Sequence, residues 1–249
     1  MKSHTILLYG ASNLWLSRRA ALTEIRKRFS GPLEIGLAHG PGRSYGLRAG
    51  NPLIRYEPLS EVEFSLGREQ RGERLALITD IGNDIAYAQE PERVIAWVSD
   101  LSTRLEAQNF RVIVGGVPAQ SLAKLNPLLF QTFARLYYPD GSVSKDQVTR
   151  DLKDVEMGLR ELCAERGYTH TELDSEWYSY DRFHLKRKAR TPYWQTLLQS
   201  YPVRRHYRTT WSFKVRKPLF PERYWLVGKE RTGTSRYLNL VPNSLTLVR

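Results

Sequence analysis

The chain has 249 residues, of which 41% are hydrophobic and 26% are charged, and its formal net charge is +12. This composition excludes a disordered chain and is typical of a globular protein with one large core. No apolar stretch approaches the ~20 residues that cross a bilayer. The N-terminal apolar stretch is followed at once by Arg18 and Arg19, so we expect neither a membrane span nor a signal peptide.

Short apolar runs rich in β-branched residues alternate with longer amphipathic runs, as in strands joined by crossover helices around a parallel sheet. We predict strands at residues 5–9, 33–38, 74–79, 111–115 and 169–173. We predict helices at residues 14–29, 91–108, 127–137 and 145–166. Residues 50–72 are expected to leave this pattern and to contain a β-hairpin.

Several polar or small residues directly follow the predicted strands, namely Ser12, Gly42, Asn83 and Gly116. Ligand sites of parallel sheets lie just beyond the carboxyl ends of the strands, so we expect a site there. Residues 40–46 contain three glycines and a proline and are predicted to form a loop. This loop lacks the Lys-Ser/Thr pair that closes a phosphate-binding Walker loop, which argues against a nucleotide site.

The last 65 residues differ from the rest of the chain. Residues 185–249 hold 15 Lys and Arg against Glu222 and Glu230, a charge of +13, whereas residues 1–184 carry −1. We expect residues 1–184 to form an α/β domain and residues 185–249 a basic, aromatic-rich extension or cap. A helix is predicted at 193–199, and β-like runs at 209–215, 224–227 and 244–248.

The extension also holds ten of the aromatic residues. Basic residues interleaved with aromatics can bind nucleic acid or another polyanion through phosphate contacts and stacking. Alternatively, these aromatics form a small core of their own.

The single cysteine, Cys163, excludes a disulfide within the chain and lies in a predicted helix, where a buried thiol is expected. A reducing, cytoplasmic location fits this cysteine usage.

The residues needed for a serine hydrolase are present in the chain. Ser12 follows the first strand, and Asp181 and His184 lie close together far downstream. A serine hydroxyl attacks carbonyls poorly unless a histidine removes its proton and a carboxylate orients that histidine.

Four short blocks resemble, in chain order, the motifs of the SGNH hydrolases, the superfamily that includes the GDSL esterases. They are the nucleophile block at residues 10–13, the glycine Gly42, the asparagine block at 81–84 and the acid and base block at 181–184. The resemblance implies a three-layer α/β/α, flavodoxin-like fold with a parallel sheet. Their order and placement carry the resemblance, since each block alone is short.

The resemblance also implies a role for each matching residue. Ser12 is the nucleophile, His184 the general base and then acid, and Asp181 the partner that orients the histidine. The oxyanion hole consists of the backbone N–H groups of Ser12 and Gly42 and the side-chain amide of Asn83. Such donors stabilise the charge that develops on the carbonyl oxygen.

The chain departs from the family pattern at three places. Ala11 replaces the aspartate of the GDSL form, which is expected to alter the hydrogen bonds that support the site. Ile81 stands where the family often has glycine, and the segment after His184 is longer than in compact members.

Other interpretations of these residues are open at the level of sequence. Ser12 is also a candidate N-cap for the first helix, and Asn83 a candidate turn residue. His39 is an alternative base, and Asp174 an alternative to Asp181 in the triad.

A metal site formed by Asp80, Asp84 and His184 is a further alternative, although no spacing typical of metal ligands supports it. Asp84 by itself fits a cap or loop anchor better than a catalytic group.

We therefore predict a serine-dependent hydrolase of acyl or acetyl esters that works through an acyl-enzyme without metal or organic cofactor. Its substrate is expected to be a small-molecule or glycan ester. The alternative is a non-catalytic protein of the same fold whose basic extension binds nucleic acid or another polyanion. The sequence leaves the oligomeric state open.

Overall fold

The structure is a computed structural model that describes residues 3–50, 54–64, 72–137, 144–204, 213–216, 223–226 and 229–232. Among these residues, no helix combines the length and the apolar character needed to cross a membrane.

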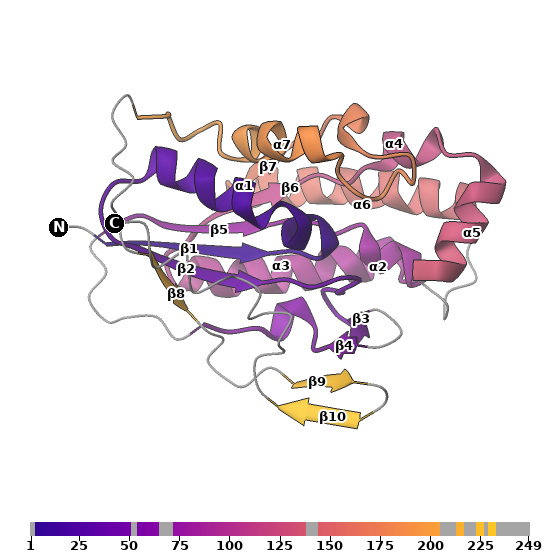
Figure 1. Cartoon of the computed structure of the whole chain (residues 1–249), viewed down its shortest axis with the longest axis horizontal. Helices are drawn as coiled ribbons and strands as arrows, with labels where there is room; N and C mark the ends of the chain where they lie inside the picture. Colours follow the sequence, from indigo (N-terminus) through magenta and orange to yellow (C-terminus); the bar gives the residue numbers. More distant parts are fainter. Residues whose placement is uncertain are drawn as a thin grey trace.

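A parallel sheet of six strands forms the centre of the fold (Figure 1), in the order β7, β6, β5, β1, β2, β8. Apart from the edge strand β8, this is the flavodoxin-like order. The strands are β1 His4–Tyr9, β2 Leu33–Ala38, β5 Arg74–Ile78, β6 Arg111–Gly115, β7 Thr169–Thr171 and β8 Phe213–Arg216.

Helices cover both faces of this sheet because side chains along each buried strand alternate between the faces. In β1, Ile6 and Leu8 point into a core shared with α1 and α7, whereas Leu7 and Tyr9 point into a core shared with α3 and α6. The predicted three-layer α/β/α fold with a parallel sheet is thereby confirmed. The helices are α1 Ser12–Arg28, α2 Asn83–Ala86, α3 Pro91–Ala107, α4 Ala119–Ala123, α5 Pro127–Tyr137, α6 Lys145–Arg166 and α7 Arg190–Leu197.

The predicted strands and long helices are present, with differences at their ends. β7 is two residues shorter than predicted, and α1 begins at Ser12 rather than at residue 14. Short 3₁₀ helices, which the hydrophobic pattern did not predict, lie at η1 Leu59–Glu61, η2 Ser175–Trp177 and η3 Arg187–Ala189. Such single turns bury too few side chains to give a periodic signal.

A second, antiparallel sheet has the order β10, β9, β4, β3 and lies beyond the β2 side of the main sheet (Figure 1). The hairpin expected within residues 50–72 corresponds to β3 Ala49–Gly50 and β4 Ile54–Tyr56. β9 Arg223–Leu226 pairs with β4, and β10 Lys229–Thr232, which was not predicted, pairs with β9. The β-like run expected at 244–248 lies outside the described residues.

Part of the segment after His184 belongs to the main core. α7 packs against α1, and Tyr193, Trp194 and Leu197 are almost completely buried there. The indole Nε1 of Trp194 donates a hydrogen bond of 2.8 Å to Ser17 Oγ on α1. β8 further extends the sheet beside β2. The expected polyanion contact of residues 185–249 stays a prediction, since much of that range lies outside the described residues.

Truncation of Trp194 tests how much this packing contributes. Because its side chain is fully buried, Trp194→Ala is expected to lower the free energy of unfolding by about 3–5 kcal/mol. Urea denaturation measures the change. Tyr180→Ala, at a side chain that is 76% exposed, is the control and is expected to change stability little. Equal stabilities for the two variants would contradict the packing of α7.

Candidate active site

The carboxyl ends of four neighbouring strands bring the candidate residues to one edge of the sheet. Register pairs Tyr9 of β1 with Ala38 of β2 and with Ile78 of β5, and Ile78 with Val114 of β6. Ser12 follows β1, Gly42 follows β2, Asn83 follows β5 and Gly116 follows β6. The four segments that hold these residues therefore start from the same edge of the sheet.

Ser12 is the first helical residue of α1, directly after the turn that leaves β1. The N-cap is Ala11, whose methyl group accepts no hydrogen bond, so the interpretation of Ser12 as N-cap is wrong. The Ser12 side chain is partly exposed, and its backbone N–H belongs to the first turn of the helix, where N–H groups lack intrahelical partners.

Asp181 and His184 form a hydrogen-bonded pair. His184 Nδ1 lies 2.7 Å from Asp181 Oδ2, and Asp181 Oδ1 accepts the backbone N–H groups of Phe183 and His184 at 3.1 and 3.0 Å. A carboxylate can only accept a hydrogen bond, so Nδ1 carries the proton in this contact and Nε2 is left as the basic atom. Burial alone would raise the pKa of Asp181, but these hydrogen bonds outweigh it, and the pKa lies below its ordinary value.

Asn13, the residue after Ser12, holds the chain on both sides of His184. Its Nδ2 donates to the Phe183 carbonyl at 3.0 Å, and its Oδ1 accepts from the Leu185 N–H at 2.8 Å. Asn13 is only 7% exposed, so water competes little for these bonds. The turn that carries Ser12 and the segment that carries His184 are thereby joined, although no hydrogen bond links the Ser12 and His184 side chains among the described residues.

The glycine loop, residues 40–46, is also in contact with the asparagine block, residues 81–84. Gly42 has a φ of +67°, a conformation that favours glycine, and a Cβ there would lie 2.8 Å from the Gly50 carbonyl oxygen. The Asn83 side chain donates from Nδ2 to the carbonyl of Arg43, the residue after Gly42, at 3.2 Å. Gly42 and Asn83 therefore lie on segments in direct contact.

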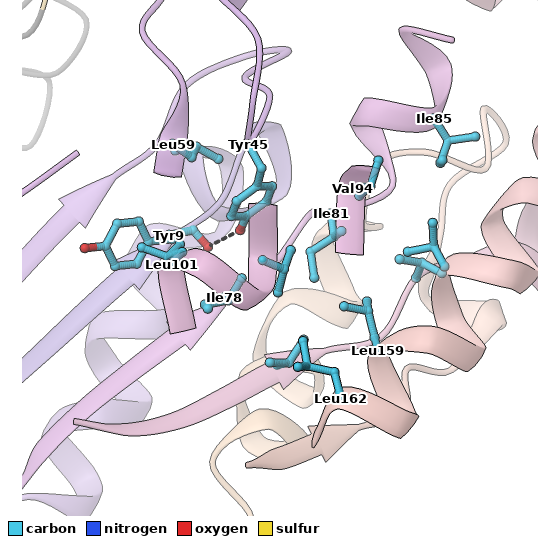
Figure 2. Close-up of a cluster of buried hydrophobic side chains, with 14 of the residues drawn as sticks. Tyr9, Tyr45, Leu59, Ile78, Ile81, Ile85, Val94, Leu101, Leu159 and Leu162 are labelled. Carbon is cyan, nitrogen blue, oxygen red and sulfur yellow. Dashed lines mark hydrogen bonds between the residues drawn. The ribbon is translucent and has the colours of Figure 1, made fainter. Parts of the chain in front are cut away.

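Two buried side chains hold the glycine loop, Tyr45 by contacts with the strand ends and Asp84 by contacts from α2. Tyr45 OH lies 2.6 Å from the Thr79 carbonyl and 3.2 Å from the Tyr9 carbonyl, as Figure 2 shows for the contact with Tyr9. Asp84, fully buried, accepts from Ser44 Oγ and, at 3.1 Å, from the Tyr45 N–H. Asp84 is thus a loop anchor, and burial raises its pKa to about 6.

The alternative triad members have other surroundings. His39 is 2% exposed, and burial followed by the nearby charges of Arg43 and Arg18 lowers its pKa to about 3. Asp174 caps η2 by accepting the Glu176 N–H at 2.8 Å. The carboxylate that pairs with His184 is Asp181, not Asp174.

A pocket opens beside Asn13 and the segment of Asp80 to Asn83. Its wall is largely apolar, because α4, α6 and the loop after β7 contribute aliphatic and aromatic side chains. The apolar side chains that line it include Leu122, Val148, Leu152, Leu173 and Phe183.

A metal site built from Asp80, Asp84 and His184 finds no support in the structure. Within the described ranges, no group of three or more His, Cys, Asp or Glu side chains is arranged to hold a metal ion.

Two polar residues of the site were not singled out as functional from the sequence. Asn13 lies within the nucleophile block, but its partners at Phe183 and Leu185 are some 170 positions away. Asp80 accepts the backbone N–H groups of Ala11 and Leu14, and was considered only as a metal ligand. Asn13 lies within the block at 10–13 and Asp80 directly before the block at 81–84, and this position is the signal that the sequence offers.

Comparisons with known proteins give fold-level similarities only. No family model matches the chain, and no curated protein matches it. Among solved structures, an esterase EstA from Pseudoalteromonas is 13% identical with a TM-score of 0.47, over 79% of this chain and 95% of that one. A structure described as a putative arylesterase from Agrobacterium tumefaciens is 13% identical with a TM-score of 0.46, over 81% and 100%. An extracellular lipase from Streptomyces rimosus is 14% identical with a TM-score of 0.43, again over 81% and 100%.

The raised pKa of Asp84 predicts a pH dependence of stability. An acid whose pKa is higher in the folded than in the unfolded state disfavours folding once it must ionise. The wild type is therefore expected to lose about 2 kcal/mol relative to Asp84→Asn as pH rises from about 4 to about 6.

Urea unfolding at several pH values through this window measures the difference. Asp100→Asn, at an exposed position on α3, controls for the loss of one carboxylate. A stability difference between wild type and Asp84→Asn that stays constant with pH would contradict the assignment.

Proposed function

We propose that this chain is a serine-dependent hydrolase of acyl or acetyl esters, of small molecules or glycans, with Ser12, His184 and Asp181 as its triad. The observation that carries the proposal is the pair of hydrogen bonds between Asn13 and the residues that flank His184, one donated to the Phe183 carbonyl and one accepted from the Leu185 N–H. Asn13 adjoins Ser12, so these bonds tie the candidate nucleophile to the candidate base across about 170 residues of sequence.

The hydrogen bond to Asp181 prepares His184 for the proton transfers of ester hydrolysis. His184 Nε2 takes the proton of Ser12 as Oγ attacks the carbonyl carbon, and it then protonates the leaving alkoxide. The acyl group stays on Ser12 as an ester. Water repeats the sequence with the same base, releases the acid and restores the serine.

The negative charge of each tetrahedral intermediate requires fixed donors. We assign the backbone N–H of Ser12, the backbone N–H of Gly42 and the side-chain amide of Asn83 to this role. The contact between Asn83 and the Arg43 carbonyl supports the assignment, since it places the amide beside the glycine loop. The Tyr45 and Asp84 contacts hold that loop in place before substrate arrives.

The pocket beside Asn13 fits an apolar group of the ester. Leu122 of α4 and Val148 and Leu152 of α6 line it, and Asn83 of the proposed oxyanion hole lines it as well. An acyl chain whose carbonyl lies at Ser12 therefore has an apolar surface within reach.

The blocks at residues 10–13, 42, 81–84 and 181–184 resemble those of the SGNH hydrolases, and the flavodoxin-like order of the strands agrees with the fold that this resemblance implies. The proposal accordingly requires neither a metal ion nor an organic cofactor.

Removal of the nucleophile or the base tests the proposed function. Ser12→Ala and His184→Ala are each expected to lower kcat for p-nitrophenyl acetate by roughly 10⁴-fold or more, with little change in thermal unfolding. Ser30→Ala, just beyond the other end of α1, is the matched control. Activity retained in either site variant, or its complete absence in the wild type, would rule out this assignment.

Narrowing the pocket tests the position of the acyl group. Leu173 is partly exposed at the pocket, so Leu173→Trp is expected to fold and to fill apolar space. The loss in kcat/KM should grow along p-nitrophenyl acetate, butyrate and hexanoate, because each buried methylene contributes about 0.8 kcal/mol. Leu128→Trp, at an exposed position on α5, serves as control. An equal loss for all three esters would place the acyl group elsewhere.

A further inference from the structure

The helix that carries Ser12 begins without a cap of its own. Its N-cap residue is Ala11, and no acidic residue lies in its first turn. The first N–H groups of a helix have no intrahelical acceptors and are normally satisfied by a polar N-cap side chain. An uncapped turn is expected to fray, which would misplace a nucleophile at the first helical position.

Asp80, from the segment after β5, supplies the missing acceptor. Its Oδ2 accepts the Ala11 N–H at 2.7 Å and the Leu14 N–H at 3.0 Å. Leu14 is the third residue of α1, the position that an N-cap side chain would normally serve. A single carboxylate oxygen therefore holds the backbone on both sides of Ser12.

The local backbone is shaped to allow this contact. Asp80 has a φ of +63°, which non-glycine residues seldom adopt without compensation from their surroundings. At Gly10 a Cβ would lie 2.5 Å from Thr79 Oγ1 and 3.2 Å from Asp80 Oδ2. Because Gly10 has no side chain, the residues after β5 pack closely against the turn that carries Ser12, and the Asp80 carboxylate can bond to that turn.

We propose that Asp80 is a positioning residue that caps α1 from another segment and holds Ser12 in its reactive place. It supplies the side-chain acceptor that Ala11 lacks at the N-cap position. This inference rests on the proposed hydrolase function for its effect on catalysis, but the cap itself is a property of the fold.

Three variants separate the cap from local strain. Asp80→Gly removes the carboxylate and accepts the positive φ, Asp80→Asn keeps an acceptor oxygen, and Asn109→Gly is a control at another residue with positive φ, 60°. We expect Asp80→Gly to lower kcat for p-nitrophenyl acetate by about 10- to 100-fold with little change in KM. Asp80→Asn is expected to restore most of kcat, and Asn109→Gly to leave it unchanged.

Amide hydrogen exchange of the full chain, measured on the same variants, reports the cap without any ester. The Ala11 and Leu14 amides are expected to exchange faster in Asp80→Gly than in the wild type and Asp80→Asn. Unchanged exchange in Asp80→Gly would overturn the cap. Faster exchange with unchanged kcat would overturn the positioning role. If the wild type shows no esterase activity, the proposed function is wrong. The hydrogen-exchange measurement would still decide whether Asp80 caps α1.

Discussion

The candidate site depends on one buried side chain, Asn13, which hydrogen-bonds the chain before and after His184. Ser12 and His184 lie on segments that a parallel sheet brings to the same edge but does not by itself place in register with one another. The two Asn13 bonds join the segment that carries Ser12 to the segment that carries His184. Since an amide left without partners in a buried place is costly, the same bonds also favour one arrangement of the two segments over others.

Each part of the site is held by contacts from outside it. Asp181 fixes the His184 ring. Tyr45 fastens the loop at residues 40–46 to the ends of β1 and β5, and Asp84 fastens it to α2. Behind the turn that carries Ser12, Ser17 Oγ donates to the Asn13 carbonyl and accepts from Trp194 Nε1. α7, which follows His184 in the sequence, therefore supports the same turn that meets His184 in space. Such fixed surroundings let donors and proton acceptors act without rearranging during a reaction.

The sequence predicted the fold well where burial produces a periodic pattern. The strands at 33–38 and 111–115 and the helix at 145–166 have the predicted bounds, because each buries one face or both over several residues. The helix at 127–137 also has the predicted bounds. The start of α1 was placed two residues late, since Ala11 gives no capping signal and the cap comes from Asp80. For the site, the short spacing from Asp181 to His184 allowed their pairing to be expected. The partners of Asn13 and Asp80 are distant in sequence, so only the folded chain identifies them.

Labelling with a fluorophosphonate, followed by mass spectrometry of the peptides, tests most directly whether Ser12 is an activated nucleophile. A serine reacts with this reagent when a base removes its proton and donors stabilise the charge on the phosphoryl oxygen. The account predicts a label on Ser12 alone in the native protein, and none after heat denaturation. A native protein that takes up no label, or takes it up equally at other serines, would contradict the assignment of Ser12, His184 and Asp181 as a working triad.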